Sequence, residues 1–227
     1  MGSSFWATAL AVAGKDLRVE WRTRTAFASS MVFAVLVLAV FYLARDPTVV
    51  LAIDVAPGAL WVTFTFAAML GLNRAFLIER ENRALDGILL SPVSRTAVFM
   101  GKLIGNLAFV SVVELISLPL FVLFYDLPIW KQLPALLAVT AMTTLAFVAV
   151  GTLLSSMVVQ TRFAELMLPI LLLPFLLPPV VGAVQLTSRI LAARPLSELA
   201  GWLKLLGAFD IIFLGLCFLL FEATLEE

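Results

Sequence analysis

The sequence has no histidine, a single cysteine and few charged residues. Charged residues make up 13% of its 227 positions, whereas apolar residues make up 63%. The missing histidine removes the commonest axial ligand for a haem iron. Cys217 has no second cysteine with which to form an intrachain disulfide or a cysteine-based zinc site, so we interpret it as a small packing residue.

Motifs of soluble catalysis are also missing. The sequence contains no G-x-x-x-x-G-K-[ST] loop for nucleotide phosphates, no metal-binding motif and no nucleophile elbow. The 15 basic and 15 acidic residues balance, which gives no indication of a nucleic-acid partner. We therefore predict a chain that is not an enzyme by itself and has no catalytic, cofactor-binding or metal-binding residues.

What the sequence does contain is apolar surface in excess. A soluble domain has roughly 45–50% apolar and about 25% charged residues, and a chain of this size cannot bury the present excess in one water-soluble core. Apolar runs long enough to cross a bilayer recur along it, without the period-two alternation of a β-barrel. We predict an all-α membrane protein with six transmembrane helices, at 26–44, 57–78, 103–125, 133–157, 165–185 and 203–221.

The first 25 residues form a separate unit in this prediction. Trp6, Leu10, Leu17 and Trp21 recur at helical spacing, and basic residues follow the apolar run instead of preceding it, which disfavours a cleaved signal peptide. We expect a cytoplasmic interfacial helix within residues 1–25, followed by a six-helix transmembrane domain at 26–227.

The distribution of Lys and Arg between the short loops predicts the orientation. One side carries Lys15, Arg18, Arg22, Arg24, Arg74, Arg80, Arg83, Arg95, Lys102 and Arg162. The other side carries Arg45, Lys131, Arg189, Arg194 and Lys204. The first set is about twice the second, so we expect that side, with both termini, to be cytoplasmic.

The segment 79–95 is the most informative polar stretch. Glu79 and Arg83 lie four residues apart, acid first, which favours a helix, and Ser91–Pro92 then ends it. Leu85, Ile88 and Leu89 give that helix an apolar edge. The segment is either a docking helix for another protein or a solvated loop that only joins two spans.

A few residues depart from a plain apolar bundle. Glu114 and Asp210 fall inside predicted spans, where a carboxyl is costly, so we expect them to be protonated or hydrogen-bonded across helices. They either line a path or hold the bundle's register. Asn73 and Arg74 are expected to reach the cytoplasmic interface.

Two predictions concern helix shape and contact. The prolines of the fifth span predict a bend: Pro169, Pro174, Pro178 and Pro179. The following stretch, Thr187 to Trp202, is long enough for a short external helix. Gly101 and Gly105 form one small-xxx-small pair, a signal too weak to predict a helix contact alone.

Several blocks together carry a resemblance that spans the chain. They are Gly14–Glu20, Ala56–Val62, Gly71–Phe76, Glu79–Arg95, Gly101–Leu103, Val113–Leu115, Leu118–Phe121, Gly151–Ser155, Gln160–Arg162 and Ala208–Asp210. In order and spacing they resemble type-2 ABC exporter permeases, and more specifically the haem exporter B (CcmB) family of bacterial cytochrome c maturation.

The resemblance implies a multi-pass subunit of the bacterial inner membrane that pairs with itself and with other proteins. Those proteins are a cytoplasmic P-loop ATPase (CcmA-like), a haem-handling membrane subunit (CcmC-like), a small single-span subunit (CcmD-like) and a periplasmic haem chaperone (CcmE-like). The complex would use ATP to export haem or to release the haem-loaded chaperone, with no haem bound directly by this chain.

The resemblance also implies that segment 79–95 couples to the ATPase. The expected contacts are Glu79, Arg80, Glu81, Arg83, Asp86, Pro92 and Arg95. Two alternatives remain: a type-2 ABC permease for a lipid, glycan or drug, and a membrane scaffold that transports nothing. A secondary transporter is disfavoured, because clear internal repeats are missing.

Overall fold

The computed structural model describes residues 5–81, 94–127, 129–158 and 164–224, and all the regular secondary structure within them is helical. The elements are α1 (Phe5–Thr23), α2 (Thr25–Ala44), α3 (Ala52–Glu81), α5 (Arg95–Tyr125), the 3₁₀ turn η1 (Ile129–Lys131), α6 (Leu133–Val158), α7 (Ala164–Leu191) and α8 (Leu196–Thr224). Six of the helices are long and apolar enough to cross a membrane, which confirms the predicted all-α membrane protein.

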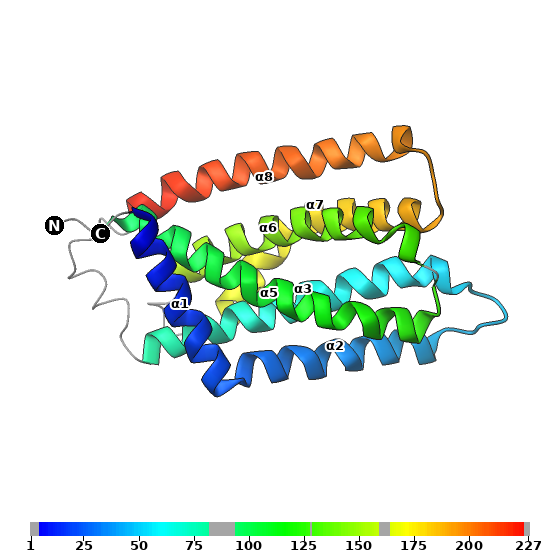
Figure 1. The fold of residues 1–227 in the computed structure, drawn as a ribbon, viewed down its shortest axis with the longest axis horizontal. Coiled ribbons are helices and arrows are strands. Elements are labelled where there is room, and N and C mark those ends of the chain that lie inside the picture. Colours follow the sequence, from blue (N-terminus) through cyan, green and yellow to red (C-terminus); the bar gives the residue numbers. More distant parts are fainter. Residues whose placement is uncertain (1–4, 82–93, 128, 159–163, 225–227) are drawn as a thin grey trace.

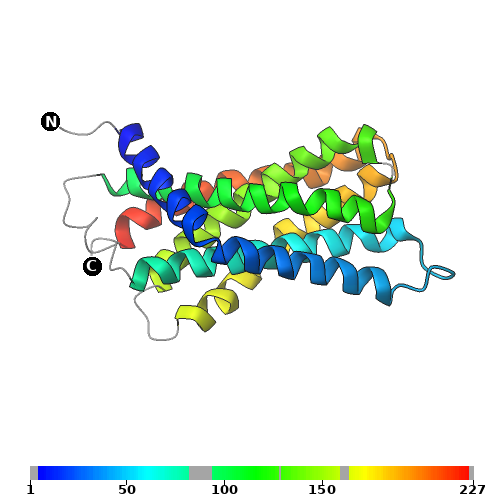
Figure 2. The ribbon, with the colours of Figure 1, turned by 60° about the horizontal axis from the view of Figure 1, so that its bottom comes forward.

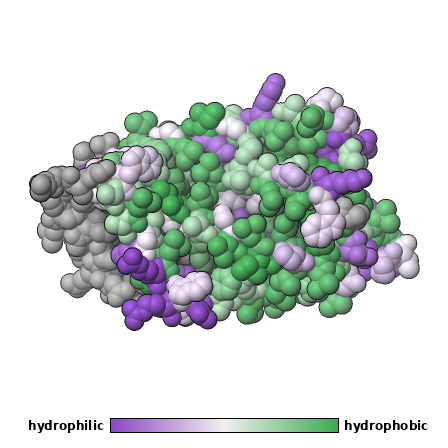
Figure 3. Space-filling model, viewed as in Figure 1, coloured by the Kyte–Doolittle hydropathy of each residue, from purple (hydrophilic) through white to green (hydrophobic). Residues whose placement is uncertain are grey.

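The six long helices run side by side, and α1 crosses one end of the bundle (Figures 1 and 2). The start of α1, the end of α8, the end of α3 and the start of α5 lie at this end, which we call the termini end. The connections from α2 to α3, from α5 to α6 and from α7 to α8 lie at the opposite end, the loop end. In Figure 3 the surface between the ends is mostly hydrophobic, as lipid contact requires.

The helices are longer than the apolar runs that predicted them. The predicted spans 57–78, 103–125 and 203–221 began too late, because α3 starts at Ala52, α5 at Arg95 and α8 at Leu196. Hydropathy reports only the part of a helix that lies in hydrocarbon, whereas backbone hydrogen bonding continues into the polar residues beyond it.

The prediction of a separate external helix in 187–202 was wrong. Helix α7 continues to Leu191, a turn with Ala193 in the left-handed region (φ 51°) follows, and α8 begins at Leu196 directly after Pro195. A residue in this conformation ends a helix, and proline fits just before the first helical turn. Residues 187–202 therefore contain the end of α7 and the start of α8, and no separate helix lies between them.

Helix α7 continues from Ala164 to Leu191 with four prolines inside it. Proline removes a backbone donor, and in lipid the freed carbonyl must find another partner or be shielded by protein. The predicted bend of this helix stays a prediction.

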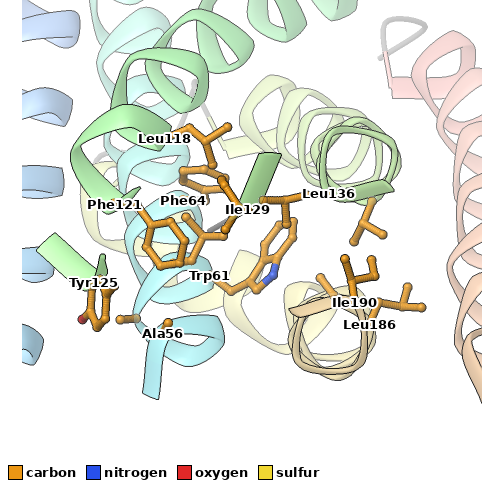
Figure 4. Packing of buried hydrophobic residues seen from close by; sticks show 14 of the residues in the cluster. Ala56, Trp61, Phe64, Leu118, Phe121, Tyr125, Ile129, Leu136, Leu186 and Ile190 are labelled. Carbon is orange, nitrogen blue, oxygen red and sulfur yellow. The ribbon is translucent and has the colours of Figure 1, made fainter. Parts of the chain in front are cut away.

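The core consists of two hydrophobic clusters at different depths. The cluster near the loop end contains Trp61, Phe64, Phe121 and Leu186; in Figure 4 the two phenylalanine rings lie on one side of Trp61 and Leu186 lies on the other. The cluster near the termini end contains Phe99, Phe147, Leu172 and Cys217, among others. Cys217 is free and buried, and its thiol donates to the Ala149 carbonyl of α6 at 3.4 Å, which agrees with its interpretation as a packing residue.

A few polar contacts join neighbouring helices through these clusters. The indole Nε1 of Trp61 in α3 donates to Thr187 Oγ1 in α7 at 2.8 Å. Ser30 Oγ in α2 donates to the Ala67 carbonyl in α3 at 2.9 Å. Because lipid is as apolar as a leucine side chain, such contacts help to fix which helices pack together.

The weak glycine signal in α5 turns out to mark a close helix crossing. A Cβ added at Gly101 would lie 2.5 Å from the Ala9 carbonyl oxygen and 2.7 Å from the Val12 Cβ, both in α1. Ala9 and Ala13 are the buried residues of α1, whereas Trp21 is 76% exposed. Small residues on both helices therefore let α1 lie directly on α5.

The two glycines provide a matched test of this crossing. Gly101→Ala would force the helices apart and should lower stability by about 1–3 kcal/mol, as overpacked sites do. Gly105→Ala should cost nothing, because its Cβ would lie 3.5 Å from the nearest atom, an ordinary contact. Unfolding of the two purified variants in mixed micelles measures the difference, and equal stabilities would show that α1 does not pack here.

Candidate functional site

The predicted coupling segment joins two helices at the termini end. Glu79, Arg80 and Glu81 belong to the last turn of α3, and Arg95 is the first residue of α5. Helices α3 and α5 pack against each other, so both ends of the segment belong to a packed pair. Arg83, Asp86 and Pro92 lie outside the described residues, and so do the side chains of Glu79, Arg80 and Glu81.

Serine caps the helix that follows the segment. The Ala97 N–H donates to Ser94 Oγ at 3.1 Å, and Ser94 itself has extended backbone angles. This satisfies one of the donors that a helix start leaves free, and serine is a preferred residue at this position. The start of α5 is thus fixed locally by the residue that precedes it.

A buried charge ties this part of α5 to α1. Lys102 is only 2% exposed, and its Nζ lies 3.8 Å from Asp16 Oδ2 of α1. Asp16 also forms an ion pair with Lys15 at 2.9 Å. Lys102 was counted among the charges of the short loops, but it lies within α5, because this helix begins earlier than its apolar run. A buried ammonium needs such a partner.

A second contact ties α1 to α2. Arg24 takes left-handed backbone angles (φ 53°) between the two helices and supplies no side-chain cap to α2. Glu20 of α1 takes that role, since its Oε1 accepts from the Phe27 N–H at 2.8 Å. A carboxylate at a helix N-terminus is also favoured by the helix dipole. We call the two contacts, Asp16 with Lys102 and Glu20 with Phe27, the α1 latch.

The two acidic residues within the spans lie between the two hydrophobic clusters. Along α5, Glu114 falls between Val110 of one cluster and Leu118 of the other. Along α8, Asp210 falls between Leu206 and Cys217 in the same way. Both carboxyls therefore lie in a middle layer of the bundle, well away from its two ends.

Glu114 is hydrogen-bonded across helices, one of the two arrangements expected. Thr144 Oγ1 of α6 lies 2.8 Å from Oε1 and 2.7 Å from Oε2 of Glu114, and also 2.8 Å from the Thr140 carbonyl of its own helix. A hydroxyl has one proton and can donate to only one of these oxygens at a time. When Thr144 donates to Thr140, its contact with Glu114 is a hydrogen bond only if the carboxyl carries a proton.

A cavity of about 190 Å³ lies beside Glu114, between α5 and α6. Phe64 and Leu118 give it apolar walls, and Ser111 and Thr140 add hydroxyl groups near the carboxyl. Below the cavity toward the termini end, Asn106 Nδ2 donates to Thr152 Oγ1 at 3.0 Å and joins the same two helices again.

Asp210 has a different environment. It is 7% exposed, and its Oδ1 has no hydrogen-bond partner within the described part of the chain. Nothing in that part joins it to Glu114 by a hydrogen bond, so the structure does not pair the two carboxyls as an intramembrane hydrolase would need.

The other predicted polar pair lies near the termini end. Asn73 is half-buried and ends the apolar part of α3, and the side chain of Arg74 lies outside the described residues. Their contact with the interface stays a prediction. Among the residues that the structure describes, no group of three or more Cys, Asp or Glu side chains could hold a metal ion.

Comparison with known proteins places this architecture in a family. The family model described as CcmB protein matches residues 7–227. The chain belongs to the CcmB protein family. The match begins within α1 and extends through α8, so the family unit includes the crossing helix as well as the six spans.

Individual members of the family align with this chain over most of their length. Heme exporter protein B of Rhodobacter capsulatus is 26% identical over 199 residues, which cover 84% of this chain and 89% of the relative. The protein of the same name from Pseudomonas aeruginosa is 27% identical over 200 residues, covering 87% and 88%. That from Paracoccus denitrificans is 26% identical over 186 residues, covering 82% and 85%.

Two neighbouring threonines of α6 test the contact with Glu114. Thr144→Val removes the only side chain that hydrogen-bonds Glu114 in the described residues and should cost about 0.6–1.7 kcal/mol, the range measured for hydrogen bonds between membrane helices. Thr143→Val is the control, because Thr143 is equally buried but donates only to the Val139 carbonyl of its own helix. Reversible unfolding in mixed micelles measures both.

Glu114→Gln should keep the contact, since its amide oxygen still accepts from Thr144. A loss in Thr144→Val no larger than that in Thr143→Val would show that the interhelical bond contributes nothing.

Proposed function

We propose that this chain is the membrane permease subunit of an ABC transporter complex for cytochrome c biogenesis. In this role it couples ATP hydrolysis on a separate ATPase subunit to haem export or to release of a haem-loaded periplasmic chaperone. The observation that carries the proposal is the CcmB family match over residues 7–227, with relatives named heme exporter protein B along most of the chain.

The architecture supports a subunit that transmits force and leaves nucleotide chemistry to a partner. The sequence contains no P-loop, and the segment 79–95 connects the end of α3 to the start of α5 at the termini end. A partner ATPase docked there would act on the ends of two packed helices. Rigid-body movement of such helices is a common way to convert a local event into a change at a distance.

Contacts between helices of the bundle determine which helices would move together with α5. The α1 latch joins α5 to α1 through Lys102, and two polar contacts, Asn106 with Thr152 and Glu114 with Thr144, join α5 to α6. Cys217 then joins α8 to α6. Packed helices shift as units and do not bend continuously. Helix α6 would therefore carry a displacement of α5 toward α8 and the loop end.

The proposed setting is the bacterial inner membrane with both termini in the cytoplasm. The excess of Lys and Arg at the termini end supports this orientation. It puts the docking segment, α1 and the ATPase subunit (CcmA-like) on one side. The loop end then faces the periplasmic chaperone (CcmE-like), and the exposed spans face lipid, a second copy, and the CcmC-like and CcmD-like subunits.

Haem is proposed as the cargo of the complex and not as a resident cofactor of this chain. The sequence offers no histidine for an axial bond to iron. The permease would supply movement, and the haem ligands would come from its partners.

Deletion of the chain tests the cytochrome assignment. Covalent haem staining of c-type cytochromes should lose all bands in the deletion strain and regain them with the intact gene. Normal staining without the chain would contradict the assignment and leave a permease for another cargo, or a scaffold, as the explanation.

Charge reversal tests the docking segment. Glu79→Lys with Glu81→Lys should abolish co-purification of the ATPase subunit and haem staining, because like charges would replace attractive contacts at the interface. Insertion into the membrane should be unchanged. The matched control is Asp54→Lys with Glu198→Lys, two exposed acids in the first turns of α3 and α8 at the loop end.

The control should retain the ATPase subunit at wild-type levels. Full co-purification with the Glu79 and Glu81 reversals would place the docking surface elsewhere on the chain.

A further inference from the structure

The cavity beside Glu114 combines features that a purely structural carboxyl does not need. Glu114 is 3% exposed, yet one side of it borders open space of about 190 Å³. A carboxyl that served only to hold α5 against α6 would need no such space beside it. Space next to a buried charge-bearing group leaves room for a ligand.

The lining of the cavity includes hydroxyl groups but no charged hydrogen-bond donor for the carboxyl. The two oxygens of Glu114 and the Thr140 carbonyl all lie within 2.8 Å of the Thr144 hydroxyl, which has one proton to share among them. No ion pair in the described part of the chain includes Glu114. A Glu114 carboxylate would therefore lack a charged partner, and a positively charged donor complements a carboxylate best.

The side chains that line the cavity, and the depth of the cavity in the bundle, indicate what the rest of the ligand must be like. Phe64, Leu115, Leu118 and Leu137 line the cavity, so the body of the ligand must be apolar. Leu115, at the depth of the middle layer, is also exposed on the lipid-facing surface of α5, and Leu137, nearer the loop end, is exposed on α6. Access is therefore sideways from the bilayer, which admits membrane-soluble compounds and excludes strongly hydrated ones.

We propose that this cavity between α5 and α6 is a binding site for a membrane-soluble ammonium compound, with the Glu114 carboxylate as its ion-pair partner. The ammonium N–H donates to Glu114, and the carbon chain lies against Phe64 and Leu118. The site is independent of the docking segment and of the proposed haem function, so either can fail without the other.

Carbodiimide labelling of the full chain in native membranes tests the site. Dicyclohexylcarbodiimide is membrane-soluble: the carboxyl proton moves to one of its nitrogens while a carboxyl oxygen bonds its central carbon. Rearrangement then leaves a stable N-acylurea that mass spectrometry locates. We expect a label on Glu114 and none at position 114 in Glu114→Gln.

Protection by a ligand supplies the decisive comparison. The probe is N,N-dimethylhexylamine, a tertiary amine that is protonated at neutral pH and cannot form an amide, and its neutral isostere is 2-methyloctane. The amine should reduce labelling of Glu114 at least about tenfold, as expected for an added ion pair in an apolar site, and the hydrocarbon should not. No labelling of Glu114, no protection by the amine, or equal protection by both compounds would overturn the proposal.

A pair of substitutions tests the entrance without touching the carboxyl. Leu137→Trp places a large side chain at the mouth of the cavity and should reduce labelling of Glu114 about as much as the amine does. Leu123→Trp is the control, because Leu123 is exposed on α5 but does not line the cavity. Equal labelling of the two variants would show that Glu114 is not reached through this opening.

Discussion

Hydrocarbon offers a peptide group no water to bond with, and this constraint governs the whole molecule. Each span must satisfy its backbone donors and acceptors internally, and a helix does so along its own length. Hydroxyl side chains follow the same rule. Thr63, Ser117 and Thr143 donate to the carbonyl four residues earlier in their own helices. Most polar groups within the spans therefore cost little and specify nothing about neighbours.

The few groups that bond between helices determine the packing. Trp61 with Thr187, Asn106 with Thr152 and Glu114 with Thr144 each join two particular helices at one particular register. In lipid the apolar surfaces of different helices are nearly interchangeable, so these contacts and the close fit of small residues carry the specificity. Helix α6 takes part in two of the three and also accepts from Cys217, which makes it central to the bundle.

The termini end differs from the rest of the bundle because charged side chains join its helices. The α1 latch uses Asp16 and Glu20 to attach the crossing helix to α5 and α2, and the proposed docking segment starts and ends on the helices beside it. A charged framework suits a surface that meets water and a partner protein. The carboxyls of the middle layer, by contrast, form no ion pair within the described part of the chain, so the Glu114 cavity has no charged donor.

The sequence by itself determined the class of protein, the number of spans and the family, because length and hydropathy follow directly from the order of residues. It did not determine where helices end beyond the hydrocarbon, so the early starts of α5 and α8 were missed. Nor did it reveal that Lys102 is buried on Asp16, that Gly101 lies under α1, or that Glu114 meets Thr144 beside a cavity. These three contacts depend on which helices become neighbours. Only tertiary packing decides this, because the partners are distant in sequence and each helix alone is satisfied without them.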